Sequence, residues 1–187
     1  MNTMRLVSNV VAFQLGWFAC VLGAAYGQPW SGTAAAIAII CWHLSSVERP
    51  GPELALVLIA AGLGALWDSA LVMLGWIHYP TGTLIEGAAP HWIVALWMLF
   101  ATTLNVSLGW LKRSVPMAAA FGLLGGPLAY LGGSKLGALV LVEPSYALTA
   151  LALGWAVLTP LLLHVATRFD GVAPDLNPAL ESEGSRV

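Results

Sequence analysis

Residues 52–76 read PELALVLIAAGLGALWDSALVMLGW. Between Glu53 and Asp68 this stretch of 25 residues carries no charged side chain. A helix needs about 20 mostly apolar residues to cross the hydrocarbon core of a bilayer. The stretch therefore predicts a transmembrane helix that carries one acidic side chain, Asp68, deep within it.

The composition of the whole chain supports a membrane location. Of 187 residues, 59% are hydrophobic and only 9% are charged, whereas a soluble domain carries about 25% charged residues. Two cysteines are too few for a secreted disulfide scaffold, and seven basic residues with a net charge of -2 argue against a nucleic-acid partner. The chain is therefore expected to be an integral membrane protein.

Apolar stretches recur along the chain and predict an all-α fold. They cover residues 6–26, 31–46, 52–76, 91–111, 115–142 and 145–167. We interpret them as a bundle of six transmembrane helices within residues 1–169, followed by a disordered cytoplasmic tail over residues 170–187. In the fifth stretch, glycines predict a helix to about residue 131 and then a bend or a short re-entrant piece over 132–142. Whether that helix is broken or merely bent stays open.

The basic residues predict an orientation. Six of the seven fall at the termini and in the 2–3 and 4–5 turns, namely Arg5, Arg49, Lys112, Arg113, Arg168 and Arg186. Only Lys135 falls on the opposite side. Because cytoplasmic loops carry the excess of Lys and Arg, both termini are expected in the cytoplasm.

Asp68 is the strongest indication of a site. An Asp near the centre of a membrane helix costs about 2.5–3.5 kcal/mol on insertion scales, so it must face the bundle interior or a wet cavity. One interpretation is a site for a ligand, an ion or a proton. The other is an internal ion pair with Lys135 or His91, which are expected on the same side of the membrane.

Four further residues are candidates for ligand binding: His91, Trp97, Tyr130 and His43. Trp97 is one of several deep tryptophans, which either pack the core or line a pocket for an apolar or lipid-like ligand. His43 precedes the turn that holds Glu48, and either pairs with it or makes an interhelical hydrogen bond.

No pattern points to catalysis or to a cofactor. Catalytic signatures such as His-Glu-x-x-His, Gly-x-Ser-x-Gly and the Walker loop are missing from the sequence. No spacing of histidines and cysteines supports a metal site. The glycines at 62, 64, 122, 125 and 126 are expected to let helices pack closely.

Several segments together resemble one known family. They are NVVAFQLGWFACVLG at 9–23, Trp42-His43, the Glu53 helix with Asp68, PHW at 90–92 with Leu96-Trp97, and GPLAY at 126–130. Over about residues 6–168 the chain resembles a bacterial family of small polytopic membrane proteins called domain of unknown function 2878 (DUF2878). The resemblance implies a bacterial inner membrane protein. Because members are often encoded near fatty-acyl-lipid modifying enzymes, it also implies a role around membrane lipids.

Three functional hypotheses follow. The first is a protein without enzymatic activity that binds or moves a small apolar or lipid-like molecule in a cavity around Asp68. The second is a membrane-embedded lipid-modifying enzyme with His43, Glu48 and Asp68 as acid/base groups. The third is a scaffold that recruits soluble fatty-acyl-lipid enzymes as partners through its cytoplasmic turns and tail.

Overall fold

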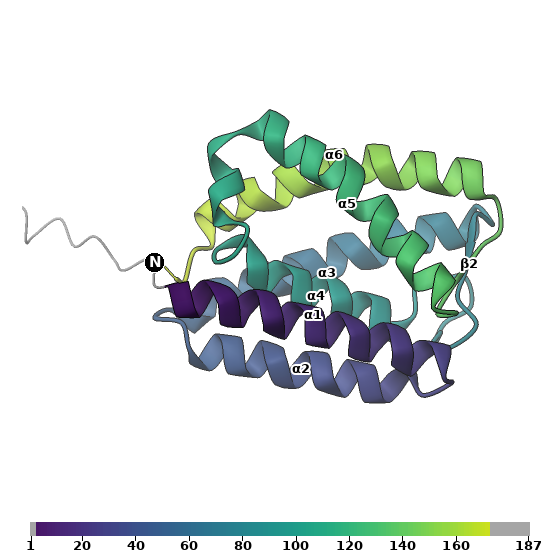
Figure 1. The fold of residues 1–187 in the computed structure, drawn as a ribbon, viewed down its shortest axis with the longest axis horizontal. Helices are drawn as coiled ribbons and strands as arrows, with labels where there is room; N and C mark the ends of the chain where they lie inside the picture. The colour runs from purple at the N-terminus through teal and green to yellow at the C-terminus, as the bar shows by residue number, and fades with distance from the viewer. Residues whose placement is uncertain (1–2, 173–187) are drawn as a thin grey trace, which may run out of the picture.

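The computed structural model describes residues 3–172 and is all-α in character. Within this range the six α-helices are α1 (Thr3–Ala25), α2 (Pro29–Ser45), α3 (Pro50–Met73), α4 (His91–Leu104), α5 (Val115–Lys135) and α6 (Pro144–Arg168). A 3-10 helix, η1 (Gly109–Arg113), follows α4, and the two-residue strands β1 (Ile77–His78) and β2 (Val140–Leu141) pair antiparallel. Figure 1 shows the pair α1–α2 on one side, the pair α5–α6 on the other, and α3 and α4 between them.

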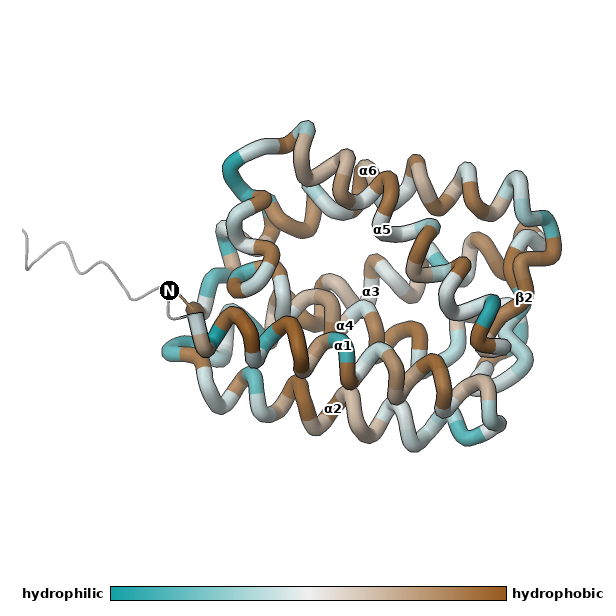
Figure 2. Tube along the Cα trace, in the orientation of Figure 1, coloured by the Kyte–Doolittle hydropathy of each residue, from teal (hydrophilic) through white to brown (hydrophobic). Residues whose placement is uncertain are grey.

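Four helices are long and apolar enough to span a membrane: α1, α3, α5 and α6. This is the pattern of a multi-pass membrane protein. In Figure 2 the hydrophobic residues follow the helices, and the hydrophilic residues gather mainly toward the two ends of the bundle. The shorter helix α4 lies at the centre, where ten of its 14 residues are buried.

The end of α4 corrects the predicted helix over 91–111. The α-helix stops at Leu104, and the chain continues through a turn into η1. Beyond this point Val106 N–H donates to the Thr103 carbonyl, so the Thr102 carbonyl accepts instead from Asn9 Nδ2 of α1 at 3.0 Å. A side chain on another helix thus satisfies a carbonyl left open where the helix ends.

The end of α5 corrects the predicted bend over 132–142. The helix runs unbroken through Gly132 and Gly133 to Lys135. Gly137, just beyond the C-cap, terminates the helix with a φ of +88° that is costly for residues with a side chain. Gly137 N–H donates to Ser134 O and Ala138 N–H to Gly133 O, the paired bonds of a Schellman motif. The chain then enters β2, so no re-entrant piece forms.

Glycines at helix contacts confirm only part of the predicted close packing. A Cβ on Gly64 would overlap the Trp97 ring, and Cβ atoms on Gly122 and Gly126 would overlap Trp155. The other two glycines of the predicted set, Gly62 and Gly125, lie against no other helix. A Cβ on Gly62 would meet nothing within 4 Å, and one on Gly125 would meet only the Phe121 ring of its own helix.

Candidate functional site

Asp68 lies on α3 inside the bundle, and its side chain is fully buried. Three side chains from three other parts of the chain donate hydrogen bonds to its carboxylate. Tyr79 Oη and Tyr130 Oη each donate to Oδ1 at 2.7 Å, and Trp97 Nε1 donates to Oδ2 at 2.7 Å. The sequence-based expectation that Asp68 faces the interior therefore agrees with this geometry.

All three partners of Asp68 are neutral donors. Neither Lys135 nor His91, the pairing residues considered from the sequence, hydrogen-bonds to it. Within residues 3–172, the Asp68 carboxylate makes no salt bridge to a Lys, Arg or His side chain. These three neutral donors would stabilise an ionised Asp68 carboxylate against the cost of its burial.

Tyr79 was missed at the sequence level because it lies outside the apolar stretches, just after β1. The segment after it folds back over the bundle, where Thr81 Oγ1 donates to Ala24 O at 3.0 Å and Trp92 Nε1 donates to Thr81 O at 3.1 Å. Burial, and then the charge of Asp68, raise the pKa of Tyr79 well above its usual value. Tyr79 therefore stays protonated and keeps donating at neutral pH.

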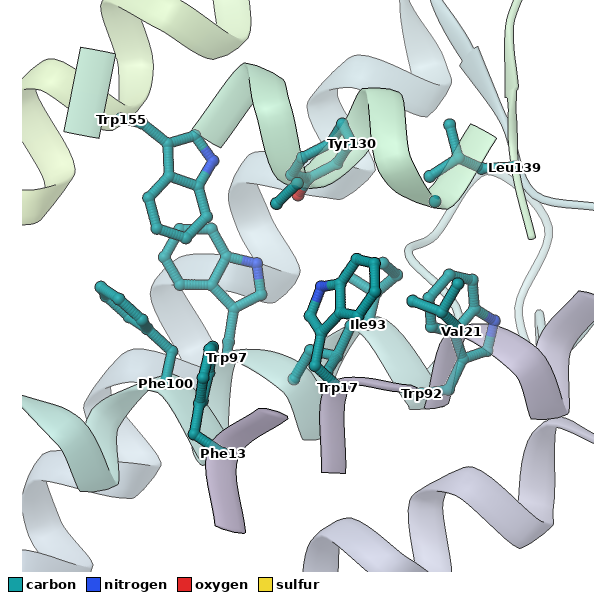
Figure 3. A pocket seen from close by; sticks show the side chains of 13 residues that line it. Phe13, Trp17, Val21, Trp92, Ile93, Trp97, Phe100, Tyr130, Leu139 and Trp155 are labelled. Atoms are coloured by element: carbon teal, nitrogen blue, oxygen red, sulfur yellow. The ribbon is translucent and has the colours of Figure 1, made fainter. Parts of the chain in front are cut away.

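A cavity of about 80 Å³ lies beside this centre. Two of its lining residues, Trp97 and Tyr130, also donate hydrogen bonds to Asp68. Figure 3 shows aromatic rings around the cavity from four helices: Phe13 and Trp17 of α1, Trp92, Trp97 and Phe100 of α4, Tyr130 of α5 and Trp155 of α6. Trp97 and Trp155 stack with ring centroids 4.5 Å apart. The deep tryptophans thus both pack together and line a pocket.

A second, larger cavity of about 430 Å³ adjoins the first. The two share five lining residues: Phe13, Trp17, Phe100, Ala129 and Trp155. Exposed side chains of α1 and α5, among them Val10, Phe121 and Leu128, also line the larger cavity. The two adjoining cavities therefore lie one behind the other between the Asp68 centre and the lateral surface of the bundle.

Comparison with known proteins places this architecture in a family. The family model described as "Protein of unknown function (DUF2878)" matches residues 6–161, which is most of the chain. The chain belongs to the DUF2878 family. Comparison with curated proteins and with solved structures gave no match. In this DUF2878 protein the Asp68 centre and all residues that line the two cavities lie within the matched range.

His91, another sequence candidate, lies apart from Asp68 in the DUF2878 protein. Its Nδ1 is 2.7 Å from Thr33 Oγ1, and its ring stacks on Trp30 with centroids 3.9 Å apart. His91 lines a different cavity, of about 270 Å³, that contains neither Trp97 nor Tyr130. Of the ligand-binding candidates, the structure brings together Asp68, Trp97 and Tyr130, but not His91.

His43 pairs with Glu53 rather than with Glu48. Its Nε2 lies 3.0 Å from Glu53 Oε2, and the Glu53 side chain is fully buried. Glu53 Oε1 accepts hydrogen bonds from Asn105 Nδ2 and from the Gly171 N–H. Sequence reasoning missed Glu53 because an acidic residue in the first turn of a helix is ordinary at a solvated helix end.

The segment after α6 completes this second centre of the DUF2878 protein. Phe169 O accepts from Asn105 Nδ2 at 3.1 Å, and Asp170 Oδ2 accepts from Lys112 Nζ at 3.0 Å. Asp170 O also accepts from Arg49 Nη2 at 2.6 Å. The contacts of residues 169–171 therefore join three turns at one end of the bundle. The rest of the predicted tail, residues 173–187, lies outside the described residues.

Proposed function

We propose that this DUF2878 protein binds the hydrocarbon chain of a lipid-like membrane amphiphile in the adjoining cavities between α1 and α4 on one side and α5 and α6 on the other. The observation that carries the proposal is the adjacency of the two cavities, which share five lining residues. Ligand pockets are typically lined by apolar and aromatic side chains with few polar groups. This lining suits an alkyl chain.

The side of entry supports a ligand that comes from the bilayer. Val10, Phe121 and Leu128 line the larger cavity and are exposed on the lateral surface of long apolar helices. A hydrocarbon chain could pass between α1 and α5 without crossing water. The protein would hold or move such a molecule.

The alternative of a lipid-modifying enzyme has less support. Fifteen residues of α3 separate Glu53, the partner of His43, from Asp68. At 1.5 Å rise per residue this is about 22 Å. A general acid or base must reach the reacting group within hydrogen-bond distance, so His43 and Asp68 do not serve one reaction centre.

We also propose that six helices cross a bacterial inner membrane with both termini in the cytoplasm. The basic side chains at the start of α1, in the α2–α3 turn, in η1 and at the end of α6 support this orientation, whereas Lys135 ends α5. In a variant with Cys20 and Cys41 replaced by Ala, the substitution Glu86→Cys should give a thiol that reacts with a membrane-impermeant maleimide in intact cells. In the same background, the thiol introduced by Arg113→Cys should react with this maleimide only after the cells are lysed.

The decisive test of the cavity is a pair of glycine substitutions. Gly125 lines the larger cavity with space around it, so Gly125→Leu should fill part of the cavity. Gly62→Leu is the matched control, because Gly62 is an exposed helical glycine with nothing near it. Mass spectrometry of protein purified in mild detergent should find bound acyl species with the wild type and Gly62→Leu, and about fivefold less with Gly125→Leu. Equal recovery from both variants would refute the proposed cavity.

A further inference from the structure

We infer that the small cavity beside Asp68 takes a cationic head group without N–H donors, namely a quaternary ammonium group. The inference rests on the proposed function, because the adjoining cavity must hold the hydrocarbon chain of the same molecule. It adds the chemical class of the ligand, which would be a cationic amphiphile.

The first argument is the charge of Asp68. Its carboxylate is fully buried and is held by two tyrosine hydroxyls and one indole N–H. These donors occupy three of the about four lone-pair sites of the carboxylate, and they do not neutralise the charge that it carries when ionised. Buried charges are normally paired, and within residues 3–172 Asp68 makes no salt bridge to a basic side chain. A bound cation would supply the missing opposite charge.

The second argument is the lining of the small cavity. Trp17, Trp92, Trp97 and Trp155 line it together with two phenylalanines and Tyr130. Aromatic rings attract cations through their quadrupole, tryptophan most strongly, and proteins use such cages for quaternary ammonium ligands. The carboxylate behind Trp97 and Tyr130 adds to the same negative potential.

The third argument is the scarcity of free hydrogen-bonding groups at the cavity, where Trp155 Nε1 is the one buried polar side-chain atom of the described lining that has no partner. Tyr130 Oη and Trp97 Nε1 already donate to Asp68. A sugar head group carries several hydroxyls and would leave most of them unpaired, which is costly. A quaternary ammonium group needs no hydrogen bond, and an anionic head group would be repelled by Asp68.

The test uses two probes with the same chain, dodecyltrimethylammonium and dodecanol, added to the full-length protein in maltoside micelles. Binding is followed by tryptophan fluorescence and by native mass spectrometry. For each probe, the apparent affinity of each variant is compared with that of the wild type. Because partition of the probe into micelles is the same in both measurements, it does not affect the ratio. Asp68→Asn should weaken binding of the ammonium probe about tenfold and leave dodecanol binding nearly unchanged. Equal effects on both probes would overturn the inference.

A second variant keeps the test decisive if Asp68→Asn does not fold. Trp17 lines both cavities, is only partly buried and does not contact Asp68. Trp17→Leu should weaken the ammonium probe about fivefold, and Trp17→Phe should restore part of the loss because a ring returns. If Trp17→Leu weakens both probes equally, the inference is wrong.

Gly125→Leu separates the two levels of the argument. It should weaken both probes, because both carry the same alkyl chain. If it does so while Asp68→Asn and Trp17→Leu show no preference for the cation, the proposed cavity stands and the cationic head group is refuted. If Gly125→Leu changes neither probe, the proposed function itself fails.

Discussion

Helix α3 carries two fully buried carboxylates, Glu53 near its start and Asp68 toward its end. Glu53 meets His43 and receives hydrogen bonds from Asn105 and Gly171. Asn105 in turn accepts a hydrogen bond from Lys112. Asp68 meets only neutral donors and adjoins a cavity.

The difference separates a structural carboxylate from a candidate binding carboxylate. Glu53 has a histidine partner that can carry charge, and its contacts fasten α3 to α2, to the end of α4 and to the segment after α6. It has three hydrogen-bond partners within the described residues. Asp68 accepts three hydrogen bonds but pairs with no basic side chain within residues 3–172, and a cavity lies next to two of its donors, Trp97 and Tyr130. Burial alone therefore does not distinguish the two acids, whereas the nature of their partners does.

The largest expected effect comes from removing Glu53. Glu53→Ala leaves His43, Asn105 and the Gly171 N–H without their acceptor, and breaking a buried pair costs about 3–5 kcal/mol. The thermal unfolding midpoint in detergent should fall strongly. Glu86→Ala, at an exposed loop position, is the control and should leave the midpoint unchanged. An unchanged midpoint for Glu53→Ala would remove Glu53 from the structural role.

Removing a donor from Asp68 should have a smaller effect on stability. Tyr130→Phe deletes one hydrogen bond to a charged group, worth about 1.5–3 kcal/mol. Tyr146→Phe is the control, because Tyr146 is an exposed tyrosine on α6. Circular dichroism during heating should show a lower midpoint for Tyr130→Phe alone. Coinciding melting curves would mean that Tyr130 does not stabilise the Asp68 charge.

The sequence predicts the position of Asp68 but not its partners. The cost of an acid in a membrane helix is local information, so an inward-facing Asp68 follows from residues 52–76 alone. Tyr79 comes from a loop and Tyr130 from a helix 62 residues further along the chain. Whether these two tyrosines come close to Asp68 depends on how α5 packs and how the loop folds back. The periodicity of apolar residues predicts neither of these. Glu53 was overlooked for the same reason, since its burial depends on Asn105 and Gly171.

Helix ends show the same division between local and distant causes. Gly75 and Gly137 end α3 and α5 through positive φ angles, a local feature that sequence can supply. The end of α4 at Leu104 was mispredicted because the apolar run continues to Leu111. There the competing partner is Asn9 of α1, which bonds Thr102 O and also accepts from Ser107 Oγ at 2.7 Å.

A pair of glycines on α3 sharpens the account of the Asp68 centre. Gly64→Ala would push against Trp97, and overpacking costs about 1–3 kcal/mol. Gly62→Ala has free space and should gain about 0.5–1 kcal/mol from helix propensity. Unfolding midpoints should therefore move in opposite directions, and only Gly64→Ala should alter the tryptophan emission. Equal shifts would show that Trp97 gives way freely and does not fix the geometry around Asp68.

The smallest expected effect concerns the cation at the Glu53 end. Lys112 Nζ lies 3.0 Å from Asp170 Oδ2, with side chains 18% and 23% exposed, and partly exposed pairs contribute about 0.2–1 kcal/mol. Lys112→Met, Asp170→Asn and the double variant form a cycle whose coupling energy, measured by thermal unfolding, should fall in that range. A loss for Lys112→Met close to that of Glu53→Ala would mean that the Lys112 charge, acting through Asn105, neutralises Glu53. In that case the two carboxylates of α3 would differ chiefly in having or lacking a cation, which is the property that a bound ammonium group would supply to Asp68.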